Sequence, residues 1–246
     1  ANSISSGIVV SAAQGTVQRN LIHDVGFGYV CGALFWCQVC ELTIQHNELY
    51  NAFGANGDAA GIDLDTGTFN STVQYNYIHD CAGSGLVCYQ PQPEGTASAI
   101  PFNNNTFRYN VLQNNATEAH GSGVYWGHIA FIGHTFSNTK FYGNTVVAGA
   151  NASGAFIRHQ VFTSLFDTGG VTGVEFYNNC FYASGAIQLI DFPSGSGTAS
   201  SHVFGHNSFY AGGSSQGINW FGTSYTSVAA WADAVSTADS FAVTTD

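Results

Sequence analysis

The sequence predicts an all-β protein, a single-stranded right-handed parallel β-helix of about seven turns with a short C-terminal capping helix. Three observations support this fold. Charged residues make up only 8% of the 246-residue chain while glycine is abundant, with 30 copies, which is typical of strands and turns. Two short motifs alternate and recur along most of the chain, and a helical pattern follows them. We therefore expect one β-helix domain over residues 1–246.

The first motif has the form apolar-x-x-Asn-x-apolar, and its copies lie 27 to 35 residues apart. One turn of a coil cannot bury its apolar face alone, but stacked turns build a continuous core. An Asn at the same place in every turn can bond to the next Asn as a ladder. The ladder residues predicted in this way are Asn20, Asn47, Asn76, Asn110, Asn144, Asn179 and Asn207.

The second motif begins with a glycine and continues with apolar residues at alternating positions, which places those residues inside the coil. It starts at Gly32, Gly61, Gly85, Gly123, Gly154, Gly185 and Gly217. Aligning these glycines gives two outward columns along one face. The first column reads Leu34, Asp63, Val87, Tyr125, Phe156, Ile187, Asn219, and the second reads Trp36, Asp65, Tyr89, Gly127, Arg158, Leu189, Phe221.

The end of the chain predicts a capping helix over residues 226–236. Thr226 or Ser227 is a suitable N-cap, and an apolar stripe of Val228, Trp231, Ala232 and Val235 follows. Such a helix would cover the open end of the coil and prevent edge pairing. The N-terminus shows no equivalent, which favours either a longer precursor or end-to-end self-association through the uncapped first turn.

The charge balance restricts the partners. Four basic residues face 15 acidic ones, so the formal charge of -11 argues against nucleic acid and anionic membranes. No apolar stretch approaches the ~20 residues that span a bilayer. The chain begins with Ala and holds no Met, which favours a processed, secreted product.

Two further features fit export. Six cysteines fit disulfides in an oxidising compartment, with Cys37-x-x-Cys40 as either a disulfide or buried thiols. Four sequons fit a glycosylated extracellular protein. The cysteines are Cys31, Cys37, Cys40, Cys81, Cys88 and Cys180, and the sequons begin at Asn70, Asn104, Asn115 and Asn151.

Asp63 and Asp65 are the candidate catalytic residues. They lie two positions apart on one strand, roughly 6.6 Å from each other, and point the same way. Close carboxylates push one pKa upward, which a general acid requires. The alternative is an ordinary acidic pair that binds calcium or stabilises a turn. We expect no cofactor and no metal site, with calcium as the one ion that such a pair would hold.

The aromatic outward columns predict a carbohydrate-binding face, because sugar rings stack on aromatic side chains and bond to fixed polar groups. His128, Arg158 and His159 lie near this face and could bind hydroxyl groups, although a lone His in such a place is more often just hydrogen-bonded. The alternative is that long loops fold over this face and bury it. His23-Asp24 and His79-Asp80 recur at the same place in two turns, which favours a structural role in the turn. The candidate substrate-binding residues are Trp36, Tyr89, Tyr125, His128, Arg158 and His159.

The segment from Gly61 to Tyr89, GIDLDTGTFNSTVQYNYIHDCAGSGLVCY, resembles right-handed parallel β-helix proteins of the pectate-lyase-like superfamily. Within that group it looks most like β-helix glycoside hydrolases, whose resemblance implies a catalytic Asp at Asp63 or Asp65 paired with a carboxylate from a nearby turn. The following turn departs from this pattern, since it offers Tyr89 and Gln90. Only four basic residues are present, so a neutral glycan is favoured over pectate or alginate.

Three functions follow as hypotheses. The first is a secreted glycoside hydrolase acting on a neutral cell-wall polysaccharide through Asp63 and Asp65. The second is a polysaccharide lyase, which requires Arg158 or Lys140 beside a metal. The third is a non-catalytic surface or filament-forming β-solenoid that stacks end to end. The fold alone does not distinguish them, since such scaffolds host enzymes and inert fibres alike.

Overall fold

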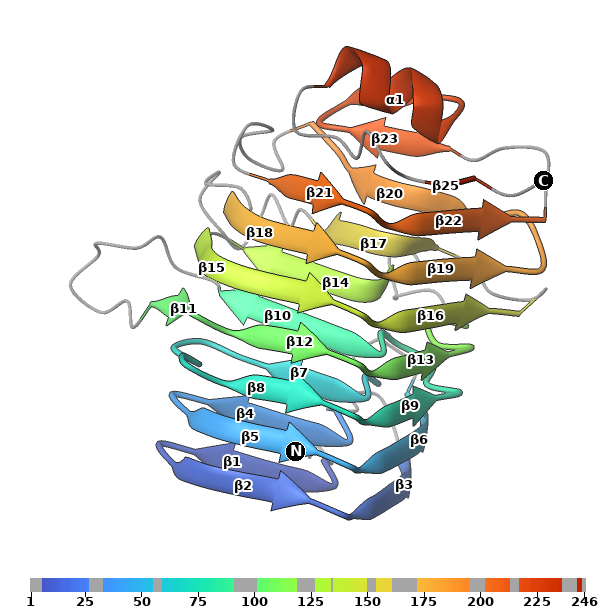
Figure 1. The fold of residues 1–246 in the computed structure, drawn as a ribbon. Helices are drawn as coiled ribbons and strands as arrows, with labels where there is room; N and C mark the ends of the chain where they lie inside the picture. The colour runs from blue at the N-terminus through green and yellow to red at the C-terminus, as the bar shows by residue number, and fades with distance from the viewer. Residues whose placement is uncertain are drawn as a thin grey trace.

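The chain forms an all-β, solenoid-like structure in a computed structural model (Figure 1). The strands pair in three mostly parallel sheets, and one helix follows near the C-terminus of the described chain. The predicted all-β class, the parallel strands and the C-terminal helix are therefore confirmed. The structure describes residues 6–26, 33–54, 59–90, 101–118, 127–133, 135–149, 154–160, 172–194, 202–212, 217–235 and 243–244.

The first sheet carries the glycine-led motif, and its strands pair in parallel except for the last one. In spatial order its strands are β1 (Ile8–Ser11), β4 (Phe35–Gln38), β7 (Ile62–Leu64), β10 (Leu86–Gln90), β14 (Gly127–Gly133), β17 (Ala155–Gln160), β20 (Gln188–Phe192), β23 (Ile218–Trp220) and the antiparallel β24 (Thr223–Tyr225).

The second and third sheets flank the predicted asparagines. The second sheet consists of β2 (Gln14–Gln18), β5 (Glu41–Gln45), β8 (Thr72–Gln74), β12 (Thr106–Arg108), β15 (Thr135–Tyr142), β18 (Thr172–Tyr177) and β21 (Val203–Gly205), with β11 (Phe102–Asn103) beside β15. The third sheet consists of β3 (Leu21–Val25), β6 (Glu48–Ala52), β9 (Tyr77–His79), β13 (Val111–Gln113), β16 (Thr145–Ala148), β19 (Cys180–Ala183), β22 (Ser208–Ala211) and β25 (Val243–Thr244).

The asparagine ladder forms as predicted, at the bend between the second and third sheets. Asn47 Nδ2 donates to Asn76 Oδ1 over 2.9 Å, and the same bond joins each ladder residue to the next at 2.9 to 3.0 Å. The oxygen also accepts the backbone N–H of the preceding ladder residue. Each bend therefore satisfies its buried polar groups through the neighbouring turn.

Apolar side chains from all three sheets fill the interior. On the second sheet a column of phenylalanines stacks face to face, with ring centroids 4.4 to 4.9 Å apart. Offset stacking at this separation adds to the free energy gained from burial. The column consists of Phe107, Phe141, Phe176 and Phe204.

The register of the first sheet corrects the glycine alignment. Phe35 lies opposite Ile62, and Cys37 lies opposite Leu64, so β4 is shifted by two residues from the predicted pairing. Alternation along a strand fixes only which residues share a face, and the shift of two residues at β4 preserves it. At β14 the predicted faces are reversed, because Val87 pairs with Ala130 and not with Tyr125. The outward column is therefore Val9, Trp36, Asp63, Val87, Ala130, Arg158, Asp191 and Asn219.

The two ends of the coil differ. Helix α1 (Val228–Ala234) lies over the C-terminal end (Figure 1), and Ser227 caps it by accepting a 3.1 Å hydrogen bond from the Ala230 N–H. Trp231 is buried against Trp220 and Phe204, which confirms the predicted apolar stripe. At the other end β1, β2 and β3 are each the last strand of their sheet within the described chain.

Candidate functional site

The outer face of the first sheet brings Asp63 and Asp65 together with two aromatic side chains. Asp63 lies opposite Trp36 on β4 and opposite Val87 on β10. Asp65 follows directly after β7, and its N–H donates a 2.7 Å hydrogen bond to the Cys37 carbonyl. Both carboxylates are half-buried on the outward side of the strand.

Three donors hold the Asp65 carboxylate. Trp36 Nε1 donates to Oδ2 over 3.0 Å, while the Thr66 backbone N–H and hydroxyl donate to Oδ1 over 2.5 and 3.0 Å. Burial nevertheless raises the pKa of Asp65 above its ordinary value, because the loss of hydration outweighs the hydrogen bonds that favour the charged form. Asp65 is therefore a fixed carboxyl group that holds its proton to a higher pH.

A small apolar cluster continues this face beyond the carboxylates. Val87, Ala130 and Ile132 are buried although they lie on the outer side of the sheet, and the half-buried rings of Trp36 and Tyr89 pack against them. The burial of these three side chains favours the alternative that part of this face is covered. Trp36 and Tyr89 remain partly exposed beside the carboxylates.

A second polar group lies further along the same face. Arg158 forms a 3.2 Å ion pair with Asp191, which is itself buried, and Asn219 Nδ2 donates to Asp191 Oδ1 over 2.8 Å. Three strand spacings separate Arg158 from Asp63, which amounts to about 14 Å. The guanidinium is thus engaged by a carboxylate, and its charge is compensated.

Two histidines lie elsewhere than the sequence predicted. His159 belongs to the inward column with Phe131 and is buried, with Nε2 3.2 Å from the Gly133 carbonyl oxygen. His128 lies at the start of β14 and is fully buried next to Phe156. Neither imidazole reaches the outer face. His159 alternates with the outward Arg158 and so faces inward, whereas His128 is buried near the start of its strand. Tyr125 lies outside the described residues.

The comparisons add no family to this geometry. No protein-family model, no curated protein and no solved structure matches the chain. Within the described residues no group of three or more His, Cys, Asp or Glu side chains is arranged to hold a metal ion. No helix in the described part of the chain is long and apolar enough to cross a membrane.

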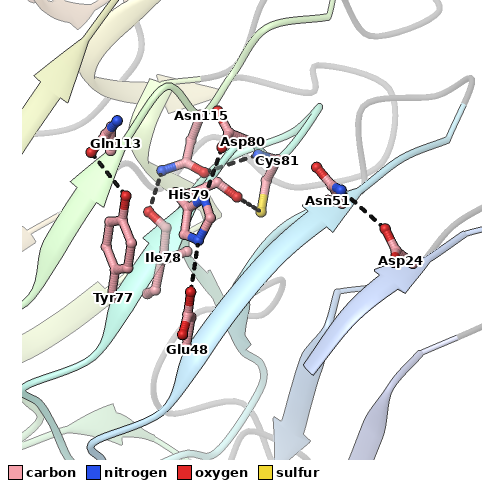
Figure 2. A network of polar contacts seen from close by, with 10 residues as sticks. All are labelled: Asp24, Glu48, Asn51, Tyr77, Ile78, His79, Asp80, Cys81, Gln113 and Asn115. Carbon is pink, nitrogen blue, oxygen red and sulfur yellow. Dashed lines mark hydrogen bonds and ion pairs between the residues drawn. The ribbon is translucent and has the colours of Figure 1, made fainter. Parts of the chain in front are cut away.

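A polar network on the third sheet brings further titratable groups together (Figure 2). His79 Nδ1 lies 2.7 Å from Asp80, and Nε2 lies 3.4 Å from Glu48. The imidazole stacks against Tyr50 and Tyr77, with centroids 4.9 and 4.2 Å away.

A second His-Asp pair, His23-Asp24, lies on β3, on the other side of Tyr50. His23 Nδ1 lies 2.7 Å from Asp24, and the His23 ring stacks on the other side of Tyr50 at 4.8 Å. Asp24 and Asp80 both have positive φ, near 55°, and Asp24 accepts a 3.0 Å hydrogen bond from Asn51 (Figure 2). These contacts fix the bend of the chain, which is the structural role predicted for the His-Asp pairs.

The expected disulfides and one expected glycosylation site are corrected. The described cysteines form no disulfide, and four of them are buried thiols. Asn115 is fully buried, with Nδ2 bonded to the Ile78 carbonyl at 3.0 Å and Oδ1 accepting from the Cys81 N–H at 3.1 Å. A glycan on that nitrogen is incompatible with this fold. Asn70 and Asn104 are exposed, and Asn151 lies outside the described residues.

Asp191 is the site residue that sequence reasoning missed. Aligning the glycine at 185 placed Leu189 in the outward column, although Leu189 is fully buried. The signal was present in the order Leu-Ile-Asp-Phe, since Ile190 and Phe192 alternate as inward residues around an outward Asp191. Only the pairing with Arg158 on β17 identifies it.

Proposed function

We propose that this chain is a secreted carbohydrate-active protein, a glycoside hydrolase that cleaves a neutral cell-wall polysaccharide at Asp63 and Asp65. The observation that carries the proposal is the Asp65 carboxyl group, which is half-buried, has a raised pKa and is bonded to Trp36 Nε1 beside Asp63. A general acid must keep its proton near the operating pH, and burial is the usual means.

The roles of the groups follow from their surroundings. Asp65 donates a proton to the glycosidic oxygen, and Asp63 acts on the opposite side of the bond as base or nucleophile. Trp36 and Tyr89 lie on the two strands that flank β7, so they can contact the sugar on either side of the carboxyl pair. The chain's acidic balance and compensated Arg158 favour a neutral glycan over a uronate.

The finer fold assignment belongs to the same proposal. Parallel strands joined by crossovers are overwhelmingly right-handed, which supports a right-handed coil, and the ladder asparagines support about seven turns. Together with the segment Gly61 to Tyr89, this supports a pectate-lyase-like β-helix.

The test is the release of reducing ends from a panel of neutral and acidic polysaccharides. Wild type is compared with Asp63→Asn, Asp65→Asn and a matched control, Asp233→Asn, whose side chain is exposed on α1. We expect activity on a neutral glycan that either site substitution reduces at least ~100-fold and the control leaves unchanged. Equal activity in all four proteins, or no release by a well-folded wild type, contradicts the proposal.

A second candidate is a non-catalytic solenoid that self-associates through its N-terminal end. The specific observation is that β1, β2 and β3 end their sheets within the described chain, while α1 covers the opposite end. Unpaired strand edges are ready templates for another chain. Sedimentation velocity distinguishes the candidates, since this function requires association that grows with protein concentration.

A further inference from the structure

The bend between the second and third sheets carries a row of large, exposed side chains. The residue before each ladder asparagine lies at this bend, and in every described turn it has a positive φ, between 54° and 64°. Glycine and asparagine adopt this left-handed conformation most readily, whereas a bulky side chain is strained in it. The residues at this position are Arg19, His46, Tyr75, Tyr109, Gly143, Asn178 and His206.

Two of these turns use the residue types that the bend prefers, and their neighbours do not. Gly143 and Asn178 suit the left-handed conformation, but Tyr75 and Tyr109 each adopt it at a φ of 55°. Tyr75 and Tyr109 are 48% and 46% exposed, so burial of their rings does little to offset the strain. Strained backbone that carries exposed aromatic rings points to a role other than folding.

The rings stack along the coil in step with its turns. The centroids of His46 and Tyr75 lie 5.2 Å apart with an interplanar angle of 7°, and those of Tyr75 and Tyr109 lie 5.4 Å apart at 16°. Contacting carbon atoms are about 3.5–4.0 Å apart, so these parallel rings are displaced sideways, and each leaves part of its face uncovered. Tyr142 meets Tyr109 edge-on, with centroids 5.6 Å apart.

These four rings, His46, Tyr75, Tyr109 and Tyr142, form an aromatic ridge. It follows the line where β5, β8, β12 and β15 lead into β6, β9, β13 and β16 (Figure 1). Its length is three strand spacings, about 14 Å. The turn of β2 and β3 precedes the ridge and the turn of β18 and β19 follows it, so described turns flank it at both ends.

Fixed hydrogen-bond donors lie beside the ridge on the outer face of the second sheet. Gln74 Nε2 donates to Gln45 Oε1 over 2.7 Å, and Arg108 Nε donates to Gln74 Oε1 over 2.7 Å. Arg108 Nη1 donates to the Tyr142 hydroxyl over 2.7 Å, and its Cζ lies 5.9 Å from the centroid of that ring. These bonds hold the side chains in place and leave the second Nε2 hydrogen of Gln74 and the remaining Arg108 N–H groups for a ligand.

This part of the surface contains no carboxylate in the described turns. Neither the bend position nor the neighbouring outward column of the second sheet carries Asp or Glu there, although the chain has 15 acidic residues. The formal charge of -11 repels an anionic polymer, whereas an uncharged chain of hydroxyl groups meets no such repulsion. The outward column reads Gln18, Gln45, Gln74, Arg108, Tyr142, Tyr177 and Gly205.

We propose that the aromatic ridge is a second binding site, which holds a neutral polysaccharide lying along the coil axis. The uncovered parts of the ring faces contact the apolar faces of successive sugars, and the amide and guanidinium groups donate to sugar hydroxyls. The ridge lies on the bend between the second and third sheets, whereas Asp63 and Asp65 belong to the first sheet. Binding at the ridge therefore anchors the protein on a polysaccharide and requires no hydrolysis.

Binding to insoluble neutral glycans tests the site on the full chain. Wild type and the double variant Tyr75→Asn/Tyr109→Asn are incubated with an excess of cellulose, chitin, xylan or β-1,3-glucan, and the protein left in solution is measured. The matched control is Tyr182→Thr on β19, because Tyr182 is 44% exposed and stacks on Tyr210 at 5.0 Å, but lies on the third sheet.

We expect wild type and the control to bind at least one of these glycans, and the double variant to bind it at least ~10-fold more weakly. Because asparagine suits this bend, the double variant should unfold at the same urea concentration as wild type or at a higher one. Equal binding by wild type and the double variant overturns the proposal, as does the absence of binding by folded wild type.

Nitration of tyrosine by tetranitromethane tests the same site without a variant. Wild type is treated with and without soluble fragments of the glycan that it binds, and the nitration of each tyrosine is measured by peptide mass spectrometry. We expect the fragments to slow the nitration of Tyr75 and Tyr109 several-fold and to leave that of Tyr182 unchanged. Unchanged nitration of Tyr75 and Tyr109, or equal slowing at Tyr182, would place the glycan elsewhere and overturn the proposal.

Discussion

Trp36 Nε1 donates a 3.0 Å hydrogen bond to Asp65 Oδ2, although the strand register sets Trp36 opposite Asp63. The indole therefore reaches diagonally past Asp63, its partner in register, to Asp65. This hydrogen bond favours the ionised form of Asp65, while burial disfavours it. Trp36 thus limits how far the pKa of Asp65 rises.

Replacing Trp36 by Phe removes the donor and keeps an aromatic ring. We expect the pKa of Asp65 to rise further, because one of the bonds to its charged form is lost. Carboxyl-carbon NMR titration measures this shift. Tyr89→Phe serves as the control, since Tyr89 lies on the neighbouring strand β10, and an equal shift in both variants would contradict the role of the indole.

Asp65→Asn is expected to change stability in a pH-dependent way. The folded pKa of Asp65 lies above the unfolded value, so the folded state binds the proton more tightly, and wild type loses stability as pH rises through this interval. The variant lacks this loss. In urea unfolding, the free energy of unfolding of the variant should therefore rise relative to that of wild type from pH 3 to pH 7. A difference in this free energy that does not change with pH would argue against a raised pKa of Asp65.

His128 should make the fold sensitive to acid. Burial lowers its pKa to about 4, and neither ring nitrogen has a hydrogen-bond partner within the described chain. A depressed histidine pKa gives stability that is complete above the unfolded value of ~6.5 and is lost as pH falls toward 4. The loss is about 3 kcal/mol. Urea unfolding of His128→Leu should lack this slope, and the exposed control His46→Gln should retain it.

The middle of the asparagine ladder should be far more sensitive than its end. Asn110→Ala removes bonds to Asn144 and to the Val73 carbonyl, and it leaves the buried Asn76 backbone N–H and one Nδ2 hydrogen without an acceptor. We expect a cost of about 3–5 kcal/mol in the free energy of unfolding. Asn20→Ala, at the first and more exposed position, should cost about 1 kcal/mol. Chemical denaturation compares them, and equal losses would contradict the ladder's cooperative role.

Asn115 should carry no glycan in folded protein from a glycosylating host. Its side-chain nitrogen is buried and bonded to the Ile78 carbonyl, so a glycan there would prevent the third sheet from closing. Peptide mass spectrometry of the secreted protein measures the occupancy. Asn104, which is exposed, provides the internal comparison. Glycan on Asn115 in a protein with native unfolding behaviour would contradict this bend.

The candidate site was predictable in part. Asp63 and Asp65 share an outward face because alternation along a strand fixes parity, and the flanking Trp36 and Tyr89 follow from adjacent turns. The burial of His159 was predictable, since it alternates with the outward Arg158, but the burial of His128 near the start of β14 was not. Asp191 was missed because its significance lies in the ion pair with Arg158.

By itself the sequence determined the all-β coil, the asparagine ladder and the C-terminal helix, because each depends on local patterns that repeat or lie within a few residues. The structure selected Ser227 over Thr226 as the N-cap of that helix. Only the tertiary structure decided the register of the first sheet, where Phe35 faces Ile62, and the contact between Trp36 and Asp65. Those relationships join segments about thirty residues apart. A shift of two residues keeps every side chain on its face, so packing between turns, and not the pattern along one strand, selects the pairing.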